Sequence, residues 1–363
     1  MPGRALTAHA YEHAEGVTLE LGETLPGFRL AYETWGDRSR AAERTIVILH
    51  ALSGSTHAFR SRENEDPGWW QRIWTPAGPV HDEGRFVVCA NLLGGCYGST
   101  GPSAIDPVSG RPYGTRFPQI TIGDMIDTYR ALLRHLGIER PWILLGGSMG
   151  GMLALQWAVT YPEEPAHAIV LVAQGKSYAQ TIAIRSVQRQ AILNDPHWKG
   201  GDYYGGTPPQ HGVELARQIG VITYRSGAEF EERFGRCERD SRPHFTQGYF
   251  EVESYLRHQG RKFHDRFDAN SYLYFSRAMD LYDMAKAHGS FAKAFARVKA
   301  RTLLVGVDTD ILCPIAQVRD VHDAMCASKR DVEMRVLRSL HGHDAFLLEG
   351  KQIVTAMREF IGE

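Results

Sequence analysis

The feature of this chain that most constrains its fold is a serine between paired glycines, in the segment Gly146-Gly147-Ser148-Met149-Gly150-Gly151. The apolar run from Trp142 to Leu145 predicts a short buried strand, and apolar residues at helical spacing predict a helix from Met149 to Tyr161. A serine on the sharp turn between a strand and a helix is the setting of the G-x-S-x-G nucleophile elbow. The glycines leave room where strand and helix crowd together, and the helix points its amino end towards developing negative charge. We therefore interpret Ser148 as a nucleophile.

Composition and charge exclude several classes of partner. The chain has 363 residues and 43% hydrophobic content, enough for one large domain with an insertion or for two domains. Its 41 basic and 42 acidic residues give a net charge of -1, so nothing electrostatic points to nucleic acid or an anionic membrane. A phosphate-binding loop in place of the elbow is disfavoured, because the Walker lysine and a G-x-G-x-x-G motif are absent. We expect a small-molecule substrate.

The cysteines indicate neither a disulfide framework nor a zinc site. They are odd in number and none has C-x-x-C spacing: Cys89, Cys96, Cys237, Cys313 and Cys326. We expect reduced thiols and no metal. Residues 1–16 lack the apolar segment of a signal peptide, and no later apolar run is long enough to span a bilayer. The sequence therefore predicts a cytoplasmic protein with no membrane or nucleic-acid partner.

Short apolar runs separated by helical patterns predict an α/β fold with a mainly parallel central sheet flanked by helices. These runs are 45–49, 85–90, 142–145, 168–173 and 301–307. Between about residues 175 and 297 the strand signal disappears and helical patterns take its place. We expect a core made of 1–175 and 297–363, with 176–296 inserted as a helical lid. A lid over the carboxyl ends of the strands would shape a substrate pocket.

A serine hydroxyl needs a base, and the base needs an orienting carboxylate. In enzymes with this kind of elbow the acid and then the histidine follow the serine along the chain. Asp308 and Asp310 both follow the strand that ends at Val307, and spacing alone does not choose between them. His341 and His343 follow a further short strand and are both placed to reach back. The residues alone leave both choices open.

Acyl chemistry also needs two N–H groups that stabilise the oxyanion. We expect one from Met149, directly after the nucleophile, and the other from Leu52, in the loop that follows the 46–49 strand. His50 lies in the same loop but precedes the serine in the chain, so we interpret it as a residue that braces this loop rather than as the base.

Several longer motifs occur along the chain beside the elbow. They are His50-Ala51-Leu52-Ser53-Gly54, residues 91–102 (NLLGGCYGSTGP), Gly110-Arg111-Pro112-Tyr113-Gly114, Arg189-Gln190-Ala191-Ile192 with Asp195-Pro196, Gly200-Gly201-Asp202-Tyr203-Tyr204, Ile222-Thr223-Tyr224-Arg225 and Gly342-His343-Asp344-Ala345-Phe346-Leu347. Together they resemble the homoserine O-acetyltransferase family, enzymes of methionine biosynthesis with the α/β-hydrolase fold. The resemblance covers nearly the whole chain.

The resemblance implies roles for particular residues. It selects Asp310 as the acid and His343 as the base, and leaves Asp308 and His341 as candidates for supporting positions. It also implies that Arg217 binds the carboxylate of an amino-acid substrate, which suits a planar bidentate donor, and that Asp344 holds the α-ammonium group.

The implied reaction is a ping-pong transfer of an acetyl group from acetyl-CoA to the γ-hydroxyl of L-homoserine, which gives O-acetyl-L-homoserine and CoA. Acyl-CoA is then a substrate, and no cofactor is expected. Succinyl-CoA as donor, L-serine as acceptor, or a plain esterase or thioesterase activity remain as alternatives. Relatives of this family also imply a homodimer.

Overall fold

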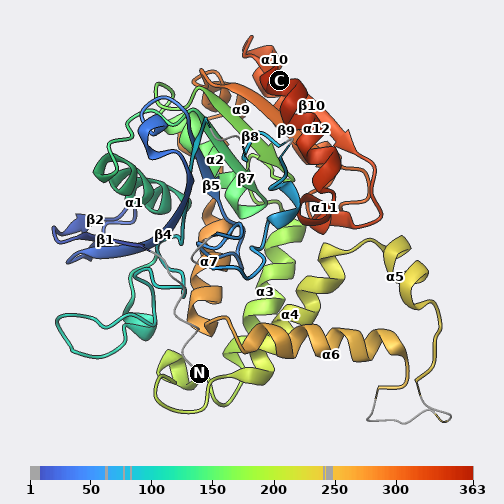
Figure 1. Cartoon of the computed structure of the whole chain (residues 1–363). Coiled ribbons are helices and arrows are strands. Elements are labelled where there is room, and N and C mark those ends of the chain that lie inside the picture. Colours follow the sequence, from blue (N-terminus) through green and yellow to red (C-terminus); the bar gives the residue numbers. More distant parts are fainter. Residues whose placement is uncertain are drawn as a thin grey trace.

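The computed structural model describes residues 9–61, 64–76, 78–81, 84–239, 242 and 248–362. An eight-stranded sheet runs through the centre of the molecule in the order β1-β4-β6-β5-β7-β8-β9-β10 (Figure 1). Its strands are β1 (His9–His13), β4 (Phe28–Gly36), β6 (Phe86–Ala90), β5 (Thr45–Leu49), β7 (Ile143–Gly147), β8 (His167–Leu171), β9 (Arg301–Val307) and β10 (Val332–Leu337), and β2 (Val17–Thr18) pairs separately with β3 (Thr24–Leu25).

The sheet is parallel except at one edge. The pairs β1–β4 and β4–β6 are antiparallel, whereas every pair from β6–β5 to β9–β10 is parallel. The central strands β5, β6 and β7 are buried along their whole length, as expected of parallel strands covered on both faces. The mainly parallel α/β sheet predicted from the sequence is confirmed.

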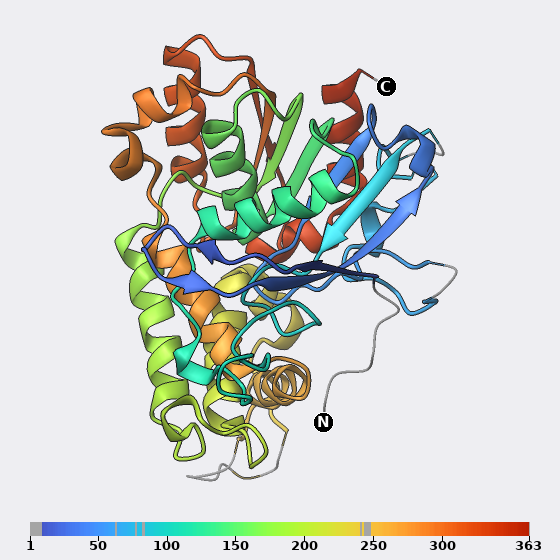
Figure 2. The same ribbon diagram turned by 90° about the vertical axis from the view of Figure 1, so that its left-hand side faces the viewer.

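Helices cover the two faces of the sheet. Side chains alternate along β5, so that Val47 and Leu49 pack into one core with α1 (Ile122–His135), α2 (Met149–Thr160) and α10 (Ile315–Ala327). Ile46 and Ile48 pack on the opposite face with α12 (Gly350–Ile361). The rotated ribbon view shows helices on both sides of the sheet (Figure 2). The helix α2 is almost entirely apolar and buried behind the expected nucleophile.

All the remaining α-helices but one lie between β8 and β9, a stretch in which the described residues form no strand. They are α3 (Ala179–Leu193), α4 (Gln210–Tyr224), α5 (Gly227–Phe234), α6 (Glu251–His264), α7 (Ala269–Leu281), α8 (Met284–His288) and α9 (Phe291–Phe295), and the exception is α11 (Ala345–Leu348). Short 3₁₀ turns occur at Arg38–Arg40, Gln71–Ile73, Gly114–Arg116, Lys199–Gly201 and Gly342–Asp344.

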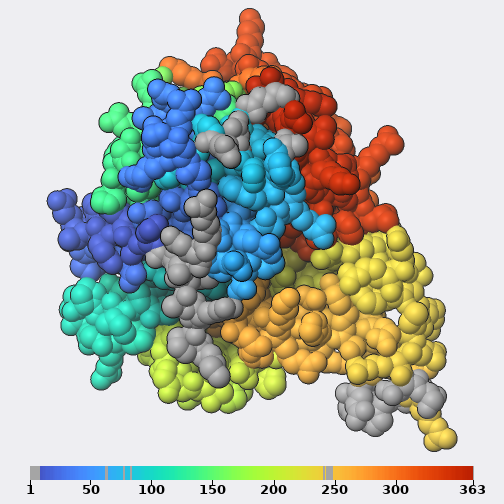
Figure 3. Space-filling view, viewed as in Figure 1, coloured from blue at the N-terminus to red at the C-terminus, as the bar shows by residue number. Residues whose placement is uncertain are grey.

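Helices α3 to α7 gather below the sheet, whereas α9 lies beside α10 at the opposite end of the molecule (Figure 1). The space-filling view shows the surface of this helical layer, lime to orange, under the blue and red core (Figure 3). The carboxyl ends of β5, β7, β8 and β9 therefore face the helical layer. None of the helices in the described chain is long and apolar enough to cross a membrane.

Candidate active site

Ser148 occupies a strained turn between β7 and α2. Its backbone has φ 57° and ψ -121°, a conformation that a residue with a side chain adopts only under constraint from its surroundings. The Ser148 N–H donates to the carbonyl of Leu171 at 2.9 Å, which ties the turn to β8. The turn places the hydroxyl above the carboxyl end of the sheet, as the sequence motif predicts.

The glycines around Ser148 are required by close backbone contacts. A Cβ on Gly146 would lie 2.2 Å from the carbonyl oxygen of Gly150, and a Cβ on Gly150 would lie 1.9 Å from that of Leu49. A Cβ on Gly147 would collide with the ring of Phe346 at 2.4 Å. Strand, elbow and helix can approach this closely only because these positions carry no side chain.

Ser148, His343 and Asp310 form a continuous hydrogen-bonded chain. The Ser148 Oγ lies 2.8 Å from His343 Nε2, and His343 Nδ1 lies 2.7 Å from Asp310 Oδ2. The other Asp310 oxygen accepts hydrogen bonds from the N–H groups of Leu312 and Cys313, both at 2.8 Å. Because Nδ1–H donates to the carboxylate, Nε2 is left free to accept the serine proton.

Asp308 and His341, the other candidates for the acid and the base, contact residues outside the hydrogen-bonded chain. Asp308 is exposed, and its carboxylate accepts from the Ser339 N–H at 3.1 Å. His341 has its Nδ1 3.2 Å from Glu229 Oε2, on the outer side of the loop. The structure thus brings Asp310 and His343 to Ser148 and leaves Asp308 and His341 beside them.

Two effects on the pKa of His343 oppose each other. Burial is the larger single effect and lowers the pKa, but the charge of Asp310 and its hydrogen bond raise it. The net result is a pKa above the ordinary value for histidine. Asp310 therefore stabilises the protonated ring of His343, the form that arises when the ring takes up the serine proton.

The loop after β5 is held by His50. The buried ring accepts the Leu92 N–H at Nε2 (3.0 Å), so its Nδ1–H donates to the carbonyl of Ala51 (2.7 Å). Burial lowers the pKa of His50 to about 4, so the ring is neutral at pH 7. In a trans peptide the carbonyl of Ala51 and the N–H of Leu52 point in opposite directions, so the ring also fixes the direction of that N–H.

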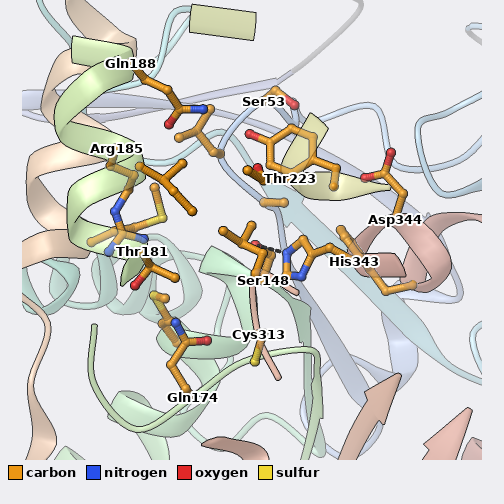
Figure 4. A pocket seen from close by; sticks show the side chains of 18 of the residues that line it. Ser53, Ser148, Gln174, Thr181, Arg185, Gln188, Thr223, Cys313, His343 and Asp344 are labelled. Atoms are coloured by element: carbon orange, nitrogen blue, oxygen red, sulfur yellow. Dashed lines mark hydrogen bonds between the residues drawn. The ribbon is translucent and has the colours of Figure 1, made fainter. Parts of the chain in front are cut away.

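A cavity of about 110 Å³ opens at Ser148 and His343 (Figure 4). Side chains of both the core and the helical layer line it: Ala51, Leu52, Ser53, Met152, Gln174, Thr181, Ile184, Arg185, Gln188, Arg217, Thr223, Tyr224, Met279, Leu312, Cys313, Asp344, Phe346 and Leu347. All the site residues predicted from the sequence line it except Asp310, which lies behind His343, and Met149, which begins α2 next to Ser148.

The two residues expected to bind the substrate, Arg217 and Asp344, both line the cavity. Arg217 on α4 lies with its guanidinium over the rings of Tyr224 (5.3 Å) and Phe263 (5.0 Å), and no carboxylate of the described residues forms an ion pair with it. Asp344 pairs with Arg225 at 3.1 Å. Burial raises the pKa of Asp344, and Arg225 followed by Arg217 opposes that rise. The cavity therefore presents one unpaired cation and one paired carboxylate.

Sequence reasoning missed several residues of the cavity wall, among them Gln174, Arg185 and Gln188. It also gave no role to Arg225, which lies within one of the motifs. No local motif marks Arg185 and Gln188, because the residues that position them, Asp280 and Ala216, are far away in the chain. The described residues contain no group of three or more histidine, cysteine, aspartate or glutamate side chains that could hold a metal ion.

Comparisons with known proteins show the family to which the chain belongs. A family model described as the alpha/beta hydrolase fold matches residues 44–349. The homoserine O-acetyltransferase of Thermobifida fusca is 44% identical over 97% of this chain and 93% of its own length. That of Carboxydothermus hydrogenoformans is 42% identical over 95% of this chain and 92% of its own.

Solved structures give the same fold. The homoserine O-acetyltransferase of Bacillus anthracis superposes with a TM-score of 0.89 at 26% identity, covering 98% of each chain. Esterase E22 superposes with a TM-score of 0.89 at 27% identity, covering 98% of this chain and 99% of its own. The same architecture therefore occurs in a protein named as a transferase and in one named as an esterase.

Proposed function

Because the chain belongs to the homoserine O-acetyltransferase family within the alpha/beta hydrolase fold, we propose that it transfers an acetyl group from acetyl-CoA to the γ-hydroxyl of L-homoserine. The observation that carries this proposal is the hydrogen-bonded chain Ser148–His343–Asp310 at the floor of a cavity that also contains Arg217 and Asp344. The products are O-acetyl-L-homoserine and CoA, and the step belongs to methionine biosynthesis in the cytoplasm, where acetyl-CoA is available.

The first half-reaction forms an acyl-enzyme. His343 Nε2 takes the proton of Ser148, and Oγ attacks the carbonyl carbon of the thioester. The N–H groups of Leu52 and Met149 stabilise the oxyanion. The carbon–sulfur bond then breaks, and His343 gives its proton to the departing sulfur, so that CoA leaves as a thiol.

The second half-reaction transfers the acetyl group to the acceptor. His343 takes the proton of the homoserine γ-hydroxyl, whose oxygen attacks the acetyl-serine ester. The bond to Ser148 Oγ breaks, and His343 returns a proton to that oxygen. No step needs a metal or a prosthetic group. Because one substrate leaves before the next reacts, the kinetics are ping-pong.

Arg217 and Asp344 orient the acceptor. The unpaired guanidinium of Arg217 binds the α-carboxylate, and the carboxylate of Asp344 binds the α-ammonium group. Asp344 directly follows His343, so the ammonium group and the base are held close together. The helical layer above the cavity limits the access of water, which would otherwise hydrolyse the acyl-enzyme.

The homodimer remains part of the proposal. Exposed apolar side chains on the outer face of α3 and α4 support it, namely Val187, Leu215 and Ile222, which are 56%, 49% and 49% exposed. Apolar side chains grouped on one face favour burial against a second copy.

The release of CoA thiol tests the proposed function. Purified protein is mixed with acetyl-CoA and with L-homoserine, L-serine or no acceptor. We expect rapid release that depends on L-homoserine, and parallel double-reciprocal plots when both substrates are varied. Equal release with and without an acceptor would instead indicate a hydrolase, the activity for which the structural neighbour esterase E22 is named. A preference for L-serine would keep the mechanism and change the product.

A further inference from the structure

The cavity contains a second cationic side chain for which the proposed reaction has no use. Arg185 on α3 lines the cavity together with Arg217 on α4. The positive charges of both residues act on the hydroxyl of Tyr224, which ends α4 and also lines the cavity, and both oppose the rise that burial causes in its pKa. The proposed acceptor has one carboxylate, which Arg217 accounts for. Arg185 therefore remains without an assigned ligand.

The Arg185 guanidinium is held rigidly and is only partly used. Its Nε donates to Asp280 on α7 at 2.7 Å, and its Nη2 donates to the hydroxyl of Ser177 at 2.6 Å. The third nitrogen, Nη1, forms no hydrogen bond with any described residue. Since guanidinium groups have five N–H donors in a fixed plane, one edge of Arg185 is still free to bind an anion.

The surroundings of Arg185 carry more positive than negative charge. Asp280 is buried and is shared by three arginines, with Arg185 at 2.7 Å, Arg189 at 2.7 Å and Arg277 at 3.7 Å. One carboxylate cannot neutralise three guanidinium groups. The excess agrees with the lowered pKa of Arg189, for which burial is the main cause and to which Arg277 and Arg185 add.

A second polar side chain of the cavity has hydrogen-bonding groups that no described residue uses. Gln174, three residues after β8, is only 3% exposed, and its amide forms no hydrogen bond with any described residue. In the close-up view Gln174, Thr181 and Arg185 lie on one side of Ser148, whereas Asp344 lies on the other (Figure 4). The amide of Gln174 faces the cavity, so it is available to form a hydrogen bond with a ligand there.

Neither acetyl-CoA nor homoserine satisfies these groups. The acetyl group ends in a methyl, which forms no hydrogen bonds. The phosphates of CoA are separated from the thioester carbon by the whole pantetheine arm. The acceptor's charged groups are already matched by Arg217 and by Asp344, and Asp344 lies on the other side of Ser148 from Arg185 (Figure 4). The remaining group that can reach Arg185 and Gln174 from Ser148 is the far end of the acyl chain itself.

We propose that Arg185 and Gln174 form a subsite for the distal carboxylate of a dicarboxylic acyl group, so that the protein also transfers succinyl-type groups from their CoA thioesters. This inference rests on the proposed acyl transfer and adds a class of donor to it. The thioester carbon–sulfur bond breaks and an ester to Ser148 Oγ forms, while the acyl chain extends towards α3. CoA leaves as a thiol at this stage. The acceptor hydroxyl then attacks the acyl-serine ester, the bond to Ser148 Oγ breaks, and His343 returns a proton to that oxygen, as for acetyl.

The ratio of kcat/KM for succinyl-CoA to kcat/KM for acetyl-CoA tests the subsite, with L-homoserine held constant. We expect wild-type protein to use both donors and to prefer succinyl-CoA to butyryl-CoA, which has the same chain length without the carboxylate. We expect Arg185→Met to lower the succinyl-to-acetyl ratio by about 30-fold, the loss that corresponds to one charge-assisted hydrogen bond. Gln174→Leu is expected to lower the ratio by a smaller factor.

Arg189→Met is the matched control. Arg189 lies one turn further along α3 and pairs with the same Asp280, but it does not line the cavity. If Arg185 acts only through this ion pair, both variants change both donors alike and the subsite is refuted. Acetyl transfer without succinyl transfer in the wild type would refute the subsite and leave the proposed function intact. The absence of transfer from either donor would refute both.

Discussion

Replacing Ser148 by alanine is expected to lower kcat/KM for acyl transfer by about four to six orders of magnitude. The variant retains the cavity, His343 and the oxyanion loop, but it has no atom that can form the acyl-enzyme. Thiol release measures the loss, and circular dichroism shows whether the variant is folded. Ser53→Ala is the matched control, because Ser53 lines the same cavity without a hydrogen bond to His343, and it is expected to retain most of the activity.

Residues that act as one unit do not contribute additively to the rate. The double variant Ser148→Ala/His343→Ala is therefore expected to be about as active as Ser148→Ala alone. Acyl transfer by Ser148→Ala at a rate near that of the wild type would show that the reaction proceeds without the serine.

Replacing Arg217 by methionine is expected to raise KM for L-homoserine by about two orders of magnitude, because a bidentate, charge-assisted contact with the α-carboxylate is lost. Acyl-enzyme formation does not involve this carboxylate, so the burst of CoA thiol in the absence of acceptor should remain. Steady-state kinetics and a rapid-mixing burst assay separate the two effects. Methionine preserves the packing on Tyr224 and Phe263 better than alanine would.

Arg217→Lys serves as the comparison for charge. It keeps the positive charge but loses the planar pair of donors, so its KM should fall between those of the wild type and Arg217→Met. An unchanged KM for homoserine in Arg217→Met would remove Arg217 from the binding site. A loss of the burst in the same variant would show instead that Arg217 supports the first half-reaction.

The sequence predicts the nucleophile well because its signal is local. The turn at Ser148 can form only if residues 146 and 150 have no side chains. The two glycines of the motif therefore indicate the turn directly. The parallel sheet is predictable for the same reason, since strands buried on both faces are continuous apolar runs.

The choice between Asp308 and Asp310 could not be made from spacing, because it depends on how the turn after β9 is stabilised. The Asp310 N–H donates a hydrogen bond to the carbonyl of Val307. The carboxylate of Asp308 accepts one from the N–H of Ser339, which follows the next strand. The resemblance to the homoserine O-acetyltransferase family selects Asp310. The geometry of His343 and Asp310 agrees with it.

Arg185 shows where prediction from the sequence ends. Helical periodicity can place it on the inner face of α3, but its position is fixed by Asp280, which is 95 residues further along the chain on α7. Gln174 is similar, since only the assembled cavity shows that its amide lacks a partner. Such residues become visible when the elements that surround them are placed together.

The mass of the intact protein after mixing with acetyl-CoA alone tests the central claim most directly. We predict that the wild type gains the mass of one acetyl group, that peptide mapping places this group on Ser148, and that adding L-homoserine removes it as O-acetyl-L-homoserine. The Ser148→Ala variant should gain nothing. Formation of O-acetyl-L-homoserine by that variant, or an acetyl group on another residue that homoserine discharges, would contradict the account.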